Sequence, residues 1–303
     1  MDHRTLHAVA RAVLEALGSE PREASIVADH LVESNLRGHD SHGVGMLPVY
    51  VRNRHRGGTV ANRRPVVVRD EGPFLVVDGE RGFGHVIGRE ATDLAVARAR
   101  QLGLAVLAIR NAGHMGRIGT YGEQCAAAGL VALYFVNGTG HEGWVAPHGG
   151  REARLSTNPM CLAFPATSAN PPVILDFATS RMSWGKIRVW RNQGRPLPEG
   201  VLLDRDGQPT RDPSVMERDP MGALLPFGEH KGWGLALMCE LLAGAVAGHT
   251  IRPDAPRGGA GVNNVLAVIL DPDRLVGRDQ LAREADLLLA HVRSSPPLDP
   301  RPP

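Results

Sequence analysis

Two histidines lie three residues apart in the stretch GHDSHGVGM, at His39 and His42, with Asp40 and Ser41 between them. A third histidine, His114, lies in the similar glycine-bounded loop NAGHMGRIG. These residue types support metal binding, nucleophilic catalysis or proton transfer. Glycine beside a histidine lets a ligand approach closely, and imidazole titrates near neutrality. Both loops therefore favour His42 and His114 as proton donors.

The metal and triad alternatives have weaker support. A lone His-x-x-His pair has no third ligand placed nearby, and the His-Glu-x-x-His pattern of zinc enzymes does not occur. Three consecutive residues rarely converge on one point, and no Gly-x-Ser-x-Gly elbow is found. We therefore expect neither a metal site nor a nucleophilic triad. Asp40 is expected to orient a histidine, and His39 to take no part.

A glycine-rich stretch, DGERGFGHVIG, invites comparison with a dinucleotide-binding turn. Its glycines, Gly82, Gly84 and Gly88, have the spacing GxGxxxG, so the third glycine comes late. The next apolar run, LAVLAI, ends at Arg110 and not at an acidic residue. The stretch therefore predicts a helix N-terminus and not a Rossmann turn.

Composition excludes several classes of protein. The 303 residues suggest about two domains, and a net charge of +2 with no basic run argues against nucleic-acid binding. No apolar run approaches the roughly 20 residues of a membrane span, and the N-terminus lacks the apolar stretch of a signal peptide. Three well-separated cysteines, Cys125, Cys161 and Cys239, suggest a reducing compartment. We expect a cytoplasmic protein without membrane or nucleic-acid partners.

Lysine is rare in this chain. Of the 34 basic residues, only Lys186 and Lys231 are lysine. A lysine retained against such a bias suggests a position that needs a compact ammonium group, and Lys231 is the stronger candidate.

Apolar periodicity and glycine positions predict alternating helices and strands. Helices are expected at 4–17, 19–37, 87–103, 120–128, 231–248 and 281–292, and strands at 74–77, 104–109, 130–136, 173–178 and 264–270. Residues 137–160 and 194–215 are expected to be irregular, and helix 231–248 to be buried on most sides. This order predicts an α/β layered fold with a helical N-terminal segment.

Six blocks occur in one order: GHDSHGVGMLPVYV, NAGHMGRIG, TNPMCLAFP, ILDFATS, GKIRVW and EHKGWGLAL. Together they resemble the malate/L-lactate dehydrogenase family, which lacks a Rossmann fold, and most closely its hydroxycarboxylate dehydrogenase branch. The resemblance implies a non-Rossmann mixed α/β fold, a nicotinamide cofactor, a small 2-oxo or 2-hydroxy acid substrate and a homodimer. It implies three parts: residues 1–58 with the Ser-His-Gly loop, residues 59–115 with 273–303 for substrate and dimer contacts, and residues 116–272 for NAD.

The same resemblance assigns roles to individual residues. His42 corresponds to a histidine beside nicotinamide and substrate, and His114 to a proton donor or acceptor. Cofactor contacts are assigned to Gly116, Arg117, Ile118, Ile174, Leu175, Asp176, Phe177, Ala178, His230, Lys231 and Asn263. NAD is the expected cofactor, with NADP as the alternative.

One departure concerns the substrate. Much of the family reads Ser-His-Gly-x-x-Arg, with the arginine thought to hold the substrate carboxylate, and here that position is Met46. Ser41 and Met46 are expected to contact the substrate, and Arg52, Arg117 or backbone N–H groups to hold its carboxylate. An apolar Met46 predicts a bulkier and less polar substrate than malate.

A second departure concerns the C-terminus. Family chains continue into a Pro-Gly-Glu segment that touches the cofactor, and this sequence stops at Pro303. The resemblance therefore implies weakened cofactor affinity. Two alternatives to a hydroxyacid dehydrogenase remain open: a cyclic imino acid reductase of the same family, and an inactive, C-terminally truncated binding protein.

Overall fold

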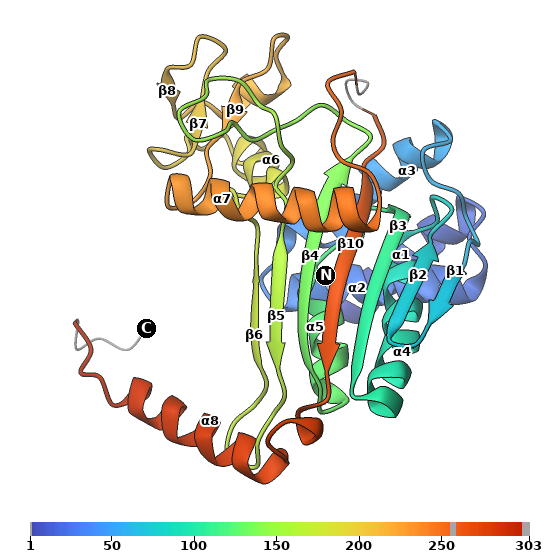
Figure 1. Ribbon diagram of the computed structural model, residues 1–303. Helices are drawn as coiled ribbons and strands as arrows, with labels where there is room; N and C mark the ends of the chain where they lie inside the picture. The colour runs from blue at the N-terminus through green and yellow to red at the C-terminus, as the bar shows by residue number, and fades with distance from the viewer. Residues whose placement is uncertain (1, 255–258, 299–303) are drawn as a thin grey trace.

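The N-terminal segment is helical in the computed structural model, which describes residues 2–254 and 259–298 (Figure 1). Helix α1 spans His3–Ala16 and begins where the Asp2 carboxylate accepts the backbone N–H groups of Arg4 and Thr5. Helix α2 spans Pro21–Leu36, with proline in its first turn. A short 3-10 turn, Asp40–His42, a second one, Val44–Met46, and helix α3, Leu47–His55, follow. The expected helical segment is confirmed.

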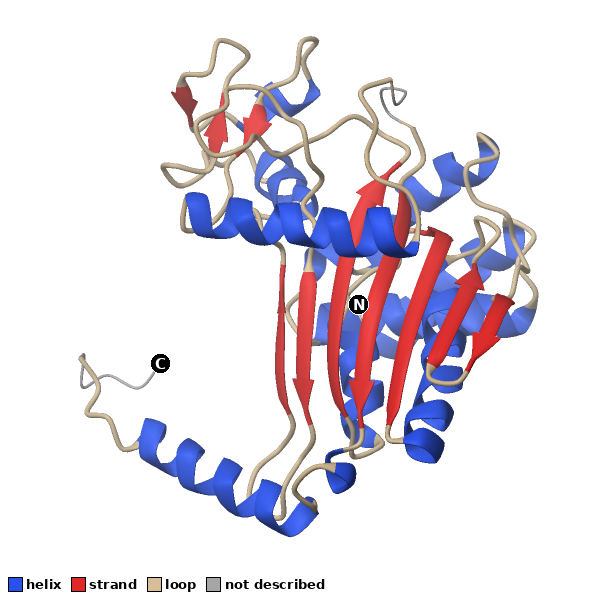
Figure 2. Ribbon diagram, viewed as in Figure 1, coloured by secondary structure: helices blue, strands red, loops and turns tan. Residues whose placement is uncertain are grey.

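One seven-stranded sheet forms the centre of the molecule (Figure 2). Its strands, in spatial order, are β1 (Val66–Glu71), β2 (Phe74–Asp78), β3 (Leu104–Gly113), β10 (Val262–Leu270), β4 (Val131–Thr139), β5 (Met160–Phe164) and β6 (Val173–Phe177). Strands β2 and β3 are parallel, whereas every other neighbouring pair is antiparallel. A doubly wound Rossmann sheet is mostly parallel, so the expected non-Rossmann mixed α/β class is confirmed.

Helices cover both faces of this sheet. Helices α4 (Gly84–Leu102) and α5 (Gly119–Ala127) lie behind it in Figure 1, and α7 (His230–Cys239) crosses the front and continues as a π-helix, Glu240–Ala247. The largest fully buried core side chains behind the sheet include Ile87, Leu107, Met115, Tyr121 and Tyr134. Helix α4 connects β2 to the parallel strand β3. This connection positions β3, and His114 is the residue that follows the last residue of β3.

A smaller unit lies beyond one end of the sheet. It contains helix α6 (Trp184–Asn192), a 3-10 turn (Pro213–Glu217) and a three-stranded sheet of β8 (Pro209–Thr210), β7 (Leu202–Leu203) and β9 (Ala223–Leu224). Its own core contains Ile187, Leu197, Leu202 and Leu224. The region 194–215, which was expected to be irregular, therefore holds short strands. A strand of two residues is too short to show an alternating pattern in the sequence.

Several expectations about elements were wrong. Strands β1 and β5 and helices α3 and α6 were not expected, because each is short and carries no clear periodicity. The helix from 231 to 248 is not buried on most sides, since Leu237, Met238, Leu241 and Val246 are exposed. Helix α8 (Arg278–Arg293) has no buried residue and extends away from the sheet (Figure 1).

The expected domain boundaries remain a prediction, although the sheet bears on them. Strand β3 belongs to the expected 59–115 part, and it pairs along its length with β10 of the expected 116–272 part. Within residues 2–254 and 259–298, no helix is long and apolar enough to cross a membrane. Residues 299–303 of the expected 273–303 part lie outside the described residues.

Candidate active site

His42 and His114 lie together, although 72 positions separate them in the sequence. Their rings stack with centroids 5.6 Å apart and an interplanar angle of 10°. His42 comes from the turn after α2, and His114 comes from the residue after β3. At the β3 end, a Cβ on Gly84 would lie 2.1 Å from the Gly113 carbonyl oxygen. Glycine in DGERGFG therefore allows helix α4 to approach the His114 loop, as expected for a helix N-terminus.

The turn that carries His42 is braced from two sides. Asn35 donates from Nδ2 to the Asp40 carboxylate at 2.5 Å, and its Oδ1 accepts the Val44 N–H at 2.9 Å. Asp40 thus holds the turn through Asn35, and the expectation that it orients a histidine is wrong. The histidine partner is Ser41, whose hydroxyl lies 2.9 Å from His42 Nδ1. Helix α6 packs against this turn at Gly185, where a Cβ would lie 2.5 Å from the Ser41 carbonyl oxygen.

The loop after His114 requires glycine at position 116. Gly116 has a φ of +71°, and a Cβ there would lie 2.5 Å from His30 Nε2 and 2.9 Å from His85 Nε2. The next residue, Arg117, donates its backbone N–H to His30 Nε2 at 2.9 Å. Asn263 on β10 accepts the Met115 N–H at 2.9 Å. These contacts hold the loop between the helical layer and the sheet.

His114 belongs to a larger buried polar cluster. The Tyr50 hydroxyl lies 2.9 Å from His114 Nδ1 and 3.2 Å from His85 Nε2. The ring of His85 meets that of His30 edge-on, with centroids 4.6 Å apart. No local sequence pattern points to Tyr50, His85 or His30, because 35 and 64 positions separate Tyr50 from His85 and His114. The one sequence signal at His85 is the glycine that precedes it in FGHVIG.

Burial controls the charge of this cluster. Burial, followed by the charges of nearby arginine and histidine residues, lowers the pKa of His30, His42 and His114 to about 3. Burial also lowers the pKa of His85 well below its ordinary value and raises that of Tyr50. All four imidazoles are therefore neutral at neutral pH, and each carries one N–H.

A cleft of about 530 Å³ opens beside His42, within the size range of small-molecule sites. Nine of the residues assigned by resemblance line it: Ser41, His42, Gly116, Arg117, Ile118, Leu175, Asp176, Phe177 and Ala178. Ile174 lines an adjoining cavity together with Arg117 and Asp176. Residues that the resemblance did not assign to a site also line the cleft, among them His39, Met182, Lys186 and Phe227. His39, which was expected to take no part, lies in the wall of the cleft, and its lack of a role remains a prediction.

Arg117 and Asp176 form the polar wall of the cleft. Asp176 accepts the Gly119 N–H at 2.8 Å, and burial raises its pKa. Arg117, only 5% exposed, pairs with Glu123 at 2.6 Å, and its Nε is a buried donor without a partner among the described residues. Such a donor favours a bound acceptor. Together with the apolar Phe177 and Phe227, this cradle fits a nicotinamide cofactor.

Other assigned residues lie away from this cleft. His230 and Lys231 are exposed at the start of α7, where the His230 ring lies 6.0 Å from that of His148. Asn263 uses its Nδ2 to donate to the Asn137 carbonyl at 2.9 Å, so both ends of its amide are engaged within the protein. Arg52 is exposed on α3. Their contacts with cofactor or substrate remain predictions.

Arg188 on α6 was not singled out in the sequence. Its Nη2 donates to the Gly45 carbonyl at 3.2 Å and lies 3.3 Å from the Met46 sulfur. Its charge is among the causes that lower the pKa of His42 and His114. Burial lowers the pKa of Arg188 itself. A half-buried guanidinium that contacts the segment after His42 is suited to hold a carboxylate.

Among the described residues, no group of three His, Cys, Asp or Glu side chains is arranged to hold a metal ion. The polar groups of the site include the histidine pair, its hydroxyl partners, the Asp176 carboxyl group, and the arginine and lysine side chains of the cleft.

The model of one protein family, malate/L-lactate dehydrogenase, matches residues 1–303. The chain belongs to this family. A relative from Escherichia coli K12, hydroxycarboxylate dehydrogenase B, is 43% identical over 99% of this chain and 83% of its own length. An L-lactate dehydrogenase from Cupriavidus necator is also 43% identical, over 95% of this chain and 83% of its own length.

Solved structures agree with this membership. A putative malate/lactate dehydrogenase from E. coli matches with a TM-score of 0.94 and 42% identity, covering 100% of this chain and 84% of that one. The family also includes a relative with a different substrate. A Δ1-pyrroline-2-carboxylate/Δ1-piperideine-2-carboxylate reductase from Pseudomonas putida is 34% identical over 95% of this chain and 84% of its own length. The chain is thus of a hydroxyacid dehydrogenase family whose members also reduce cyclic imino acids.

Proposed function

We propose that this protein interconverts 2-oxo acids and 2-hydroxy acids with a nicotinamide cofactor. The main support is the pair of neutral histidines at a cleft of about 530 Å³: His42 lines the cleft, and His114 stacks on the ring of His42 with centroids 5.6 Å apart. Each ring has its Nδ1 engaged by a hydroxyl, from Ser41 and Tyr50 respectively. The Nε2 atom of each ring is then the nitrogen that can meet a substrate oxygen.

The cofactor would be held by the cradle around Gly116 and Arg117 and by the strand end at Leu175–Ala178. When bound, a reduced nicotinamide supplies a hydride. Lys186 and Arg181 add positive charge to the same cleft and suit the cofactor phosphates. NAD is the proposed cofactor and NADP the alternative.

His114 is the proposed proton donor. Its Nε2–H protonates the alkoxide that forms at C2 of the substrate, and Tyr50 fixes the ring through Nδ1. His42, stacked against it and held by Ser41, positions the substrate oxygen. Arg188 holds the carboxylate in place of the arginine that Met46 replaces, and the Met46 side chain favours an apolar substituent.

The test measures oxidation of NADH and of NADPH with pyruvate, oxaloacetate, phenylpyruvate and Δ1-piperideine-2-carboxylate. Reduction of a 2-oxo acid supports the proposal. Faster reduction of the cyclic imino acid supports the second candidate, which the P. putida relative favours. Cofactor binding without turnover of any of these compounds would instead indicate an inactive binding protein.

We further propose that the protein is a cytoplasmic homodimer. All three cysteines are free and buried, in keeping with a reducing compartment. Exposed apolar side chains on the α7 and α8 segments, among them Leu241, Val246, Leu287 and Leu288, suit contact with a second copy. Analytical ultracentrifugation tests the assembly, and a monomer at micromolar concentration would contradict it.

A further inference from the structure

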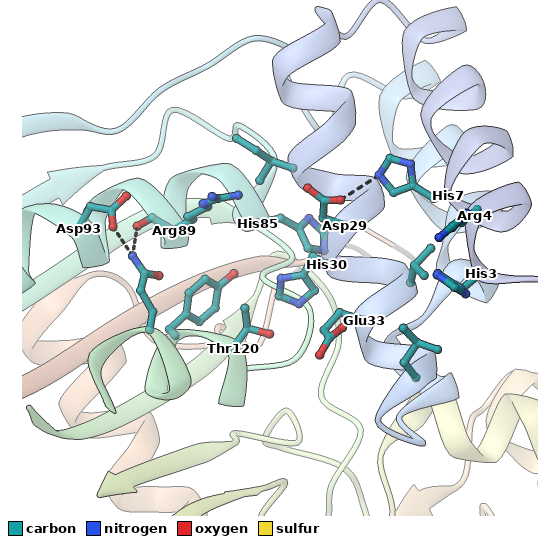
Figure 3. Close-up of a pocket in the computed structure, with 15 residues that line it drawn as sticks. His3, Arg4, His7, Asp29, His30, Glu33, His85, Arg89, Asp93 and Thr120 are labelled. Atoms are coloured by element: carbon teal, nitrogen blue, oxygen red, sulfur yellow. Dashed lines mark hydrogen bonds and ion pairs between the residues drawn. The ribbon is translucent and has the colours of Figure 1, made fainter. Parts of the chain in front are cut away.

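A second cavity, of about 730 Å³, lies between α1, α2, α4 and α5 on the other side of the histidine cluster. It shares no lining residue with the catalytic cleft. Figure 3 shows His30 and His85 together in its wall, surrounded by polar residues. These are His3, Arg4, His7, Asp29, Glu33, Arg89, Asp93 and Thr120. Apolar side chains, Ile26, Val32 and Leu36, complete the wall, so polar and apolar groups both line this cavity behind the proposed proton donor.

A continuous set of contacts joins His114 to this cavity. His114 Nδ1 lies 2.9 Å from the Tyr50 hydroxyl, which lies 3.2 Å from His85 Nε2. His85 is only 1% exposed and lines the cavity. Its other nitrogen, Nδ1, is buried without a hydrogen-bond partner among the residues that the structure describes. A buried polar nitrogen without a protein partner calls for a water molecule, and the cavity that His85 lines is the space from which one would reach it.

We propose that Tyr50 and His85 form a proton relay that resupplies His114 from water in this second cavity. The relay rests on the proposed function, because reduction of a 2-oxo acid leaves an alkoxide that takes one proton from His114 Nε2. The Tyr50 hydroxyl proton then moves to His114 Nδ1, and the His85 Nε2 proton moves to the Tyr50 oxygen. His85 Nδ1 takes one proton from a hydronium ion in the cavity and leaves water behind, so the protein gains and loses one proton and every ring stays neutral. Both rings are then protonated on Nδ1, and the same transfers in reverse, with the cleft open to water after product release, return them to the Nε2 tautomer.

Two features make this route necessary and specific. A neutral imidazole lends only the proton it carries, and substrate and cofactor in the cleft would exclude water from His114 on that side. His30 lies beside the route and does not carry it, because its Nε2 is engaged by the Arg117 backbone N–H at 2.9 Å. The relay therefore passes through His85.

The kinetic test compares Y50F, H85A and the control Y134F. Tyr134 is also buried and its hydroxyl also meets two groups, Thr92 and Cys125, but it lies in the core away from the cluster. Both relay variants are expected to lower kcat for 2-oxo acid reduction by about 10-fold or more with little change in KM, whereas Y134F stays near wild type. Added imidazole should restore turnover in H85A. Wild-type kcat in H85A, or a lowered kcat that imidazole does not raise, would overturn the relay.

A second measurement does not depend on activity. The Tyr50 hydroxyl carries one proton between two nitrogens, so the tautomers of His85 and His114 must match: both protonated on Nε2, or both on Nδ1. Nitrogen-15 NMR of the labelled histidines reads these tautomers directly, and Y50F should remove the match. Unmatched tautomers in the wild type would overturn the relay. Matched tautomers in a protein that reduces no 2-oxo acid would leave the relay standing and contradict the proposed function instead.

Discussion

The Nη2 atom of Arg188 lies 3.3 Å from the sulfur of Met46, so a guanidinium of α6 contacts the segment that follows His42. The proposed function assigns the substrate carboxylate to this guanidinium and the substrate side chain to Met46.

Arg188→Gln should weaken binding of the 2-oxo acid. Loss of a charged hydrogen bond to a carboxylate costs about 1.5–3 kcal/mol, which corresponds to a roughly 10- to 100-fold higher KM. The cofactor dissociation constant should not change. Arg191→Gln is the matched control, because Arg191 lies on the same helix and pairs with Glu217. Equal KM values in the two variants would show that Arg188 does not hold the carboxylate.

Met46 should set the preference for the substrate side chain. It is only 9% exposed and packs in the apolar cluster with Tyr50, so it favours an apolar substituent. We expect kcat/KM to be higher for phenylpyruvate than for oxaloacetate in the wild type. Met46→Arg should shift this ratio toward oxaloacetate, since a second guanidinium would meet the second carboxylate. A wild-type preference for oxaloacetate would refute the role of Met46.

His42→Ala and His114→Ala should each lower kcat by at least about 100-fold, because both rings act on the transition state. His55→Ala, at the exposed end of α3, is the control and should retain wild-type turnover. Steady-state kinetics at saturating substrate distinguishes the three variants. Wild-type kcat in either active-site variant would remove that histidine from the mechanism.

Gly116→Ala should disrupt the site more than backbone strain alone explains. The added Cβ would lie 2.5 Å from His30 Nε2, whereas nothing lies within 4 Å of the equivalent atom at Gly149, which has a similar φ of +79°. Gly149→Ala therefore measures the left-handed strain, about 1–2 kcal/mol. We expect Gly116→Ala to lower the free energy of unfolding by about 1–3 kcal/mol more than this control. Urea denaturation of both variants gives the difference, and equal losses would argue against the packing constraint.

Acid should destabilise the fold through the buried histidines. The pKa of His30, His42 and His114 is about 3 in the folded protein and about 6.5 in the unfolded chain. Between these values the unfolded state binds more protons, so the free energy of unfolding falls as pH falls from about 6.5 toward 3. Each histidine contributes about 1.4 kcal/mol per pH unit within that window.

Urea denaturation at several pH values measures this slope. Asp176 acts in the opposite sense, because burial raises its pKa and its protonation favours the folded state. His30→Gln should reduce the slope by about one proton, whatever its effect on stability at pH 7. An unchanged slope would mean that His30 is not held neutral in the folded protein.

The sequence by itself determined most of the layered architecture. Apolar runs such as LAVLAI and LVALYFV, with helices between them, predicted the strands that became β3 and β4, because burial of alternating elements leaves a periodic pattern. The irregular glycine spacing at 82–88 correctly argued against a Rossmann turn. Glycine beside His42 and His114 identified the two histidines that the structure brings together.

Only the tertiary structure decided what surrounds those histidines. Tyr50, His85 and Arg188 contact the pair or its neighbours from three different helices, and no local pattern distinguishes such residues before the helices pack. It also showed that Asp40 braces Asn35 and that His39 faces the cleft, because the side-chain direction in a 3-10 turn depends on its packing partners. A hydrogen bond between distant segments requires its donor and acceptor to lie within narrow limits of distance and angle. The spacing of residues along the sequence does not specify these limits.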